Sequence, residues 1–204
     1  MTSDAPDHES KPRVDEFFDA LTDEYAAAIE RCFPRYREML WALLDYLPAD
    51  LDASRILELG SGTGNLSVLL AERYPNATIE MVDVSPDSLA VCRERLGDDS
   101  RFRYREEDFR KLSDQPESFD LVVSSIAVHH LRSMEKQELF DQLFRALRPG
   151  GVFAYADQHS GATTEITQRH TQHWRDASMG AGSSESEWEM WMQHQRDHDY
   201  HDNT

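Results

Sequence analysis

The sequence has few cysteines, few basic residues and no long apolar run. Cys32 and Cys92 lie far apart and match no metal-ligand spacing, so we expect reduced thiols. The 21 basic residues face 39 acidic ones, and the formal charge of −18 disfavours nucleic acid and anionic membranes as partners. No stretch of about twenty apolar residues suits a transmembrane helix, and the first ten residues lack a secretory pattern. These absences predict a cytoplasmic protein.

The apolar content is sufficient for one globular domain, because 39% of the 204 residues are hydrophobic. Residues 1–12 are polar and contain two prolines, which is typical of a disordered leader. We expect the main domain to span residues 13–158 and to begin with helices that form a lid. Residues 159–204 are polar and rich in His, Gln, Glu and Trp, which predicts a helical tail without strands.

Apolar runs of strand length alternate with helical patterns through the middle of the chain, which is typical of parallel sheets with helices on both faces. Ser85 and Pro86 supply a cap and a first-turn proline for one helix, and Ser133 is the expected cap of another. The expected strands are Arg55–Leu59, Thr78–Val82, Arg101–Arg105, Phe119–Ser125 and Val152–Ala156. The expected tail helices are Thr164–Ala177 and Glu185–His198.

A glycine-rich loop follows the first expected strand and precedes a helix. Its sequence is Gly60-Ser61-Gly62-Thr63-Gly64-Asn65, and glycines there let the backbone turn tightly and approach a ligand. A dinucleotide fingerprint would have Gly or Ala at position 65, where this chain has Asn65. The loop therefore predicts a nucleotide-type crevice and disfavours a pyrophosphate ligand.

Two acidic positions follow the next strands. Asp83 lies 23 positions after Gly60, where a carboxylate can accept hydrogen bonds from both hydroxyls of a ribose; taken alone, it could also be a helix cap. Asp108 and Phe109 follow the third strand, where they would contact an adenine ring. The alternative for that pair is a solvated acidic turn beside a buried phenylalanine.

Taken together, the segments ELGSGTGN, VDVSPDSL, EEDF, FDLVVSSIAVHHL and LFRALRPGGVFAYAD resemble the class I S-adenosylmethionine-dependent methyltransferases in order and spacing. The resemblance runs from about Phe17 to Asp157. It implies a three-layer Rossmann-like α/β fold with the mostly parallel strand order 3-2-1-4-5, and S-adenosylmethionine as cofactor.

The resemblance also implies which residues bind the cofactor. The glycines would face its methionine part, Asp83 its ribose, and Val84, Asp108 and Phe109 its adenine, while Ser124 and Ser125 would line the sulfonium side and Tyr25 would close over the carboxylate. The full implied set is Tyr25, Glu58, Gly60, Ser61, Gly62, Gly64, Asp83, Val84, Asp108, Phe109, Ser124 and Ser125.

The family's sheet normally carries two further strands after the fifth, and this sequence shows none. An unpaired fifth strand would favour a homodimer through the sheet edge, or coverage by the tail. We expect the tail helices to fold back over that edge or over the crevice.

His129 and His130 follow the fourth strand at the expected mouth of the crevice. Some small-molecule O-methyltransferases similar to this chain place a histidine near the transferred methyl group, with an acidic partner after the fifth strand, where this chain has Asp157. These three residues are the candidate catalytic groups. The alternative is that one histidine packs the loop and the other is solvated.

The tail contains five further histidines after position 160, and His194 and His198 would share a helix face. The glutamate of the HExxH motif and partnering cysteines are missing, so no metal site is expected. Trp174, Trp188 and Trp191 are interpreted as packing residues.

Three functions remain to be compared. The favoured one is an enzyme that methylates a small molecule bound between the N-terminal helices and the loops after strands four and five. The second is a non-catalytic or partner-dependent S-adenosylmethionine-binding module. The third, a nicotinamide oxidoreductase, is disfavoured by Asn65.

Overall fold

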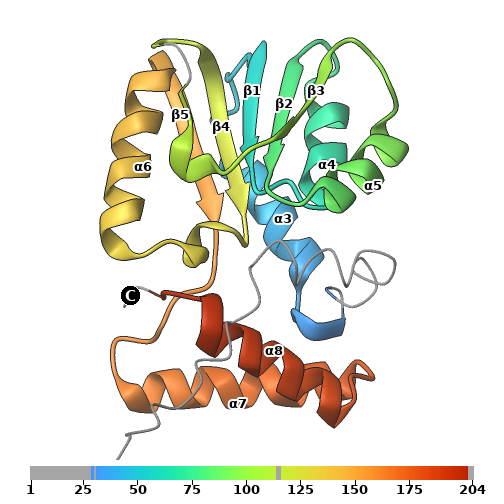
Figure 1. The fold of residues 1–204 in the computed structure, drawn as a ribbon, viewed down its shortest axis with the longest axis vertical. Coiled ribbons are helices and arrows are strands. Elements are labelled where there is room, and N and C mark those ends of the chain that lie inside the picture. The colour runs from blue at the N-terminus through green and yellow to red at the C-terminus, as the bar shows by residue number, and fades with distance from the viewer. Residues whose placement is uncertain (1–28, 30, 114–115, 202–204) are drawn as a thin grey trace, which may run out of the picture.

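The computed structural model describes residue 29, residues 31–113 and residues 116–201 (Figure 1). Tyr25 and most of the expected lid therefore lie outside the described residues. Five parallel strands form one sheet in the order β3-β2-β1-β4-β5, which confirms the predicted fold class. The strands are β1 (Arg55–Leu59), β2 (Thr78–Asp83), β3 (Phe102–Glu106), β4 (Phe119–Ser125) and β5 (Leu147–Ala156).

Helices cover both faces of this sheet. On β1, the neighbouring residues Ile56 and Leu57 belong to separate apolar clusters, because successive side chains of a strand point to opposite faces. The first cluster contains residues of α3, α4 and α5, and the second contains residues of α6. These helices are α3 (Tyr36–Asp45), α4 (Asn65–Arg73), α5 (Pro86–Leu96) and α6 (Ser133–Ala146), with the short 3-10 helices η1 (Phe109–Lys111) and η2 (Val128–His130).

Two local predictions need correction. The expected cap of α6 was Ser133, but the N-cap position is held by Arg132, whose N–H donates to Glu135 Oε2 at 2.8 Å. The last strand begins at Leu147 rather than at the expected Val152, so it includes Pro149. Strand β5 is the outer strand of the described sheet, where a residue without an N–H costs little. The predicted cap of α5 is confirmed, since Ser85 Oγ accepts from Ser88 N at 3.0 Å.

The tail forms two helices, α7 (Thr164–Gly180) and α8 (Glu185–His198), below the carboxyl ends of the strands (Figure 1). The tail therefore lies on the crevice side of the sheet and not along the outer edge of β5. The carbonyl oxygen of Cys32 accepts hydrogen bonds from Trp174 Nε1 and from Ser178 Oγ. The ring of Phe33 packs against Trp174 and Trp191, with centroids 5.5 and 5.4 Å apart. The tryptophans are packing residues, as predicted.

None of the helices in the described part of the chain combines the length and apolar composition that crossing a membrane requires.

Candidate functional site

The glycine-rich loop turns sharply between β1 and α4. Gly60, Gly62 and Gly64 all have positive φ angles, of 65°, 51° and 85°. A Cβ atom on Gly60 would lie 2.4 Å from Ala127 Cβ, and one on Gly64 would lie 2.7 Å from Cys92 Sγ. No atom lies within 4 Å of the corresponding position on Gly62. The outer glycines thus permit close packing of the loop, while the middle one leaves open space beside the backbone.

Asp83 ends β2 beside this loop. Its Oδ2 atom accepts a hydrogen bond from Gly62 N at 2.7 Å, and its Oδ1 atom accepts one from Ser85 N at 3.0 Å. The same residue therefore fixes the glycine loop and the start of α5. A carboxylate offers about four lone-pair positions, so both oxygens retain capacity for hydroxyl donors of a ligand.

A cavity of about 120 Å³ lies between the loop, Asp83 and the residues after β3 and β4. Most of the predicted cofactor residues line it. They are Gly60, Ser61, Gly62, Asp83, Val84, Asp108, Phe109 and Ser125. The remaining lining residues are Ile29, Tyr36, Thr63, Asn65, Leu66, Arg110, Ile126, Ala127, His130 and Leu131.

Three predicted cofactor residues do not line the cavity. Glu58 is buried beneath α4, where its Oε2 atom accepts from Ser67 Oγ at 2.6 Å, and burial raises its pKa to about 8. Ser124 donates from Oγ to Leu59 O at 2.9 Å and so links β4 to β1. Gly64 packs against Cys92. These residues support the loop from behind.

The adenine side of the predicted site differs from expectation at Asp108. Both carboxylate oxygens lie 2.9 Å from Arg110 Nε, and Oδ1 also accepts from Arg110 N at 3.0 Å. Burial would raise the pKa of Asp108, but these hydrogen bonds outweigh it and lower the pKa. An adenine amine would therefore compete with Arg110, a residue that the sequence interpretation missed.

Two hydroxyl groups in the cavity wall suit a polar ligand. Ser61 Oγ and Thr63 Oγ1 are buried and have no hydrogen-bond partner within the described residues. Buried polar atoms normally have hydrogen-bond partners. Two hydroxyl oxygens without partners beside a cavity therefore indicate a place where a polar group of a ligand binds. The residues present thus fit a ligand with hydroxyls near Asp83 and further polar groups near the loop.

A second cavity, of about 290 Å³, adjoins the first, since Tyr36 and Ile126 line both. Tyr36 was missed because its place in α3 follows the apolar pattern of a core residue, and its hydroxyl accepts from Asn65 Nδ2 at 3.3 Å. The tail supplies much of the wall. The other lining residues are Phe33, Pro34, Met39, Asp157, Gln158, His159, Ser160, Thr167, His170, Thr171, Trp174, Gln195 and His201.

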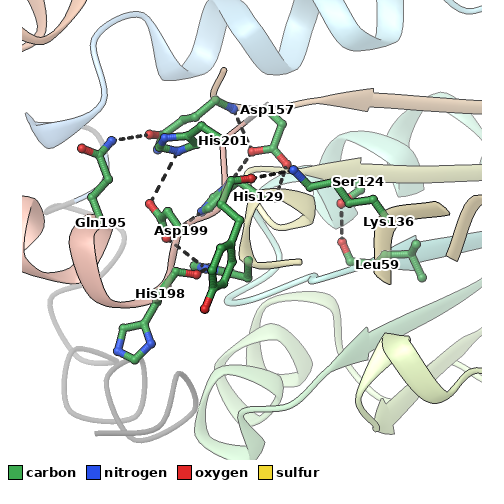
Figure 2. Close-up of polar contacts among 12 residues, drawn as sticks. Leu59, Ser124, His129, Lys136, Asp157, Gln195, His198, Asp199 and His201 are labelled. Atoms are coloured by element: carbon green, nitrogen blue, oxygen red, sulfur yellow. Dashed lines mark hydrogen bonds and ion pairs between the residues drawn. The ribbon is translucent and has the colours of Figure 1, made fainter. Parts of the chain in front are cut away.

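His129 and Asp157 meet at the ends of β4 and β5 (Figure 2), and the His130 ring packs beside that of His129, with centroids 4.1 Å apart. His129 Nδ1 lies 2.5 Å from Asp157 Oδ1, and His129 N donates to Asp157 Oδ2 at 3.0 Å. The His129 ring lines neither of the two cavities described above, whereas His130 lines the first and Asp157 the second. Both imidazoles are mostly buried, so the alternative with one solvated histidine is wrong.

The electrostatics of the two histidines differ. Burial lowers the pKa of His129, but the hydrogen bond and charge of Asp157 outweigh it, and the net pKa is raised. The pKa of His130 is lowered by burial and by the neighbouring His129. The lowered pKa makes His130 the weaker base of the two but keeps its ring neutral at pH 7, the form that can accept a proton, and His130 lines the first cavity.

The known proteins that this chain resembles are methyltransferases. A family model described as a methyltransferase domain matches residues 56–151. A malonyl-[acyl-carrier protein] O-methyltransferase from Geobacter sulfurreducens is 32% identical over 144 residues, which cover 71% of this chain and 51% of that protein. A trans-aconitate 2-methyltransferase from Variovorax paradoxus is 37% identical over 103 residues, covering 50% of this chain and 38% of that protein.

A solved structure of an S-adenosylmethionine-dependent methyltransferase from Mesorhizobium loti is 31% identical and superimposes with a TM-score of 0.52, covering 63% of this chain and 56% of that one. The chain spans about half the length of the relatives it matches in sequence.

Proposed function

Because the chain belongs to the class I S-adenosylmethionine-dependent methyltransferases, we propose that it binds S-adenosylmethionine in the first cavity and methylates a small molecule held in the second. The observation that carries the proposal is the position of Asp83, which fixes the glycine loop through Gly62 and also lines the cavity. When bound, the cofactor supplies an electrophilic methyl group on a sulfonium sulfur.

Different residues of the first cavity would bind different parts of the cofactor. Asp83 would accept hydrogen bonds from the ribose hydroxyls, and Val84 and Phe109 would cover the adenine. The open backbone at Gly62 and the hydroxyls of Ser61 and Thr63 would face the methionine part. Tyr25, from the residues outside the structure, would close over the carboxylate.

The second cavity supports a small acceptor. Its volume of about 290 Å³ is at the low end for small-molecule sites. Tyr36 and Ile126 line both cavities, so the two cavities adjoin at these residues. An acceptor in the second cavity would therefore lie beside the methyl group. The chain would accelerate transfer mainly by holding the two reactants in line and excluding water, because the sulfonium charge fades during displacement.

His129, His130 and Asp157 would act when the acceptor must lose a proton. The acceptor atom must reach the methyl group in the first cavity, which His130 lines, and there the neutral imidazole would accept its proton as a general base. The Asp157–His129 pair would position His130, because the two histidine rings lie 4.1 Å apart between centroids. An acceptor that is already an anion would need no base.

We test cofactor binding by calorimetric titration of the chain with S-adenosylmethionine and, separately, with NAD. Saturable binding of S-adenosylmethionine alone is expected. Replacing Asp83 with Ala should weaken it by about 10- to 100-fold, the effect of losing hydrogen bonds to a charged group. The Asp87→Ala variant is the control, since it removes an exposed carboxylate four residues away. Binding of NAD, or equal affinity in the Asp83 variant, would overturn the assignment.

Turnover distinguishes the enzyme from a non-catalytic or partner-dependent binding module. Formation of S-adenosylhomocysteine should be measured with a panel of acceptors that begins with a malonyl thioester and trans-aconitate, the compounds named for the two relatives. Saturable cofactor binding without turnover on any acceptor would favour the binding module.

We also propose that the chain is cytoplasmic and pairs with a second copy through β5. The thiols of Cys32 and Cys92 are buried and unbridged, which suits a reducing compartment. Along the outer edge, Tyr155 is 39% exposed, and on the adjoining α6 Phe144 is 83% exposed. Sedimentation analysis of the wild type and of Tyr155→Arg tests the pairing: a dimer that the substitution dissociates is expected, and a monomeric wild type would refute it.

A further inference from the structure

Four imidazole rings surround the carboxylate of Asp199 where the tail meets the loop after β4, and Figure 2 shows two of them, those of His129 and His201. Asp199 Oδ1 lies 3.1 Å from His130 Nδ1, 3.6 Å from His129 Nε2 and 3.8 Å from His194 Nε2. Asp199 Oδ2 lies 3.7 Å from His201 Nε2. The Asp199 side chain is only 3% exposed. Residues some 70 positions apart thus converge on one buried carboxylate.

The spacing of these atoms matches that of metal ligands. One ligand atom each from His129, His130 and Asp199 lies within 4.8 Å of the others. Zinc binds imidazole nitrogen at about 2.0–2.1 Å in a tetrahedron, whose ligand atoms are then about 3.3 Å apart. The distances of 3.1 and 3.6 Å from Asp199 Oδ1 to the two histidine nitrogens bracket this value. Three protein ligands leave the fourth tetrahedral position for another group, and His194 Nε2 lies beside this set, 3.8 Å from Asp199 Oδ1.

An outer shell is also present. A histidine that binds a metal through one nitrogen usually donates from the other to a carboxylate, which fixes the ring. His129 faces Asp199 with Nε2 and lies 2.5 Å from Asp157 Oδ1 with Nδ1. Asp157 is held in turn by backbone N–H groups of His129 and Gln158, at 3.0 and 2.8 Å.

Hydrogen bonds within the described residues leave part of the cluster unsatisfied. Asp199 Oδ1 and His201 Nε2 are buried and make no hydrogen bond of acceptable geometry. A buried carboxylate oxygen whose neighbouring imidazole nitrogens are poorly aligned for hydrogen bonds is costly, and a cation would remove that cost.

We propose that His129, His130 and Asp199 bind a divalent zinc-type ion that ties the tail to the loop after β4. The imidazole-rich, thiol-free ligand set suits Zn²⁺ and its spectroscopic substitute Co²⁺ rather than Mg²⁺ or Ca²⁺. Sequence inspection of the tail alone missed the site, because two of its ligands come from the η2 segment and Asp199 lies beyond α8.

The ion would change the roles of the two loop histidines. While the ion is bound, His129 and His130 would be neutral ligands, and the base role proposed for His130 would apply only to the metal-free chain. Methyl transfer would then depend on positioning, which suffices for an anionic acceptor. Metal binding is separable from cofactor binding, because of the three proposed ligands only His130 lines the first cavity.

The test uses the tag-free chain, stripped with a chelator and titrated with Co²⁺. One equivalent should bind with the visible absorption of a tetrahedral ion, without thiolate-to-metal bands, and one equivalent of Zn²⁺ should displace it. The variants Asp199→Asn and His130→Ala each remove a direct ligand. Their loss of Co²⁺ affinity should exceed the roughly 10- to 100-fold loss that is typical when an outer-shell partner is removed. His173→Ala, on the exposed face of α7, is the control and should bind as the wild type does.

A second measurement distinguishes a variant that has lost a metal ligand from one that has failed to fold. Circular dichroism of the stripped proteins reports whether each variant folds, and the nearly isosteric Asp199→Asn decides the question if His130→Ala does not fold. Zn²⁺ should raise the melting temperature of the wild type and leave that of Asp199→Asn unchanged. Absence of saturable Co²⁺ binding, or an equal response from Asp199→Asn and the wild type, would overturn the proposal.

Discussion

His129 and Asp157 form a buried pair, with Nδ1 and Oδ1 2.5 Å apart, that joins the ends of two neighbouring strands, β4 and β5. The pair fixes the segment that carries His130 into the first cavity. It also directs the other ring nitrogen of His129, Nε2, toward Asp199 in the tail.

Replacing Asp157 with Asn should lower the free energy of unfolding by about 3–5 kcal/mol, because it leaves one partner of a buried ion pair. The His129 pKa is raised, so its contribution is complete below pH 6.5 and is lost as pH rises through the folded pKa. The Asp157 pKa is lowered, so its contribution is present above pH 3.8 and is lost as pH falls through the folded pKa. The difference between the proteins should therefore be greatest between about pH 4 and 6.5.

Urea unfolding at pH 3, 5.5 and 9, with chelator present throughout, measures this difference. A constant difference across the three pH values would show that the effect comes from packing and not from charge.

Glu58 should make the protein less stable as pH rises. Burial raises its pKa from 4.5 to about 8, so the folded protein retains a proton that the unfolded chain loses. Stability should fall between these pH values by up to about 1.4 kcal/mol per pH unit. The Glu58→Gln variant can still accept from Ser67 and should lose this slope, as urea unfolding would measure. Glu94→Gln, an exposed position on α5, should retain the slope of the wild type.

The glycine loop offers a pair of substitutions that separates packing from ligand binding. Ala at position 60 would clash with Ala127 and strain a positive φ, so we expect a loss of about 2–4 kcal/mol in stability. Ala at position 62 bears the same backbone strain without a clash and should cost about 1–2 kcal/mol. It should nevertheless weaken cofactor binding, because Gly62 lines the cavity. Thermal unfolding and calorimetry test both, and equal stability losses would contradict this interpretation.

The tail should loosen when Phe33 is replaced with Ala, since its ring packs against both Trp174 and Trp191. We expect a loss of about 1–3 kcal/mol, less than for a fully buried ring. Hydrogen exchange should accelerate in α7 and α8 while the central strands stay protected. Phe144→Ala, an exposed ring on α6, is the control. Unchanged exchange in the tail would mean that other contacts hold it in place.

The sheet was predictable because its pattern is local. Apolar strand segments, the glycine loop and the Ser85-Pro86 helix start fixed the order of elements, and the strand order followed from family resemblance. Asp83 and Phe109 were singled out because each follows a strand, Val84 came from the family resemblance, and all three line the first cavity. Strand β5 was placed too late, because Pro149 and the two glycines after it suggested a turn.

The rest of the site depends on contacts between distant segments. Nothing in the sequence near Asp108 shows that Arg110 occupies its carboxylate, and the role of Tyr36 requires knowing which cavity α3 adjoins. The approach of Asp199 to His130 joins residues 69 positions apart, and each looks ordinary in its own segment. Such pairs become visible only once the chain is folded.

The walls of the two cavities differ in how freely they can change during evolution. The first is built from turns that also hold the parallel sheet together, so substitutions there carry a penalty in stability. The second takes much of its wall from exposed and half-buried side chains of α7 and α8, which no strand needs. Natural variation among descendants should therefore gather in the tail and diversify the accepted compounds, while the ancestral sheet stays the same.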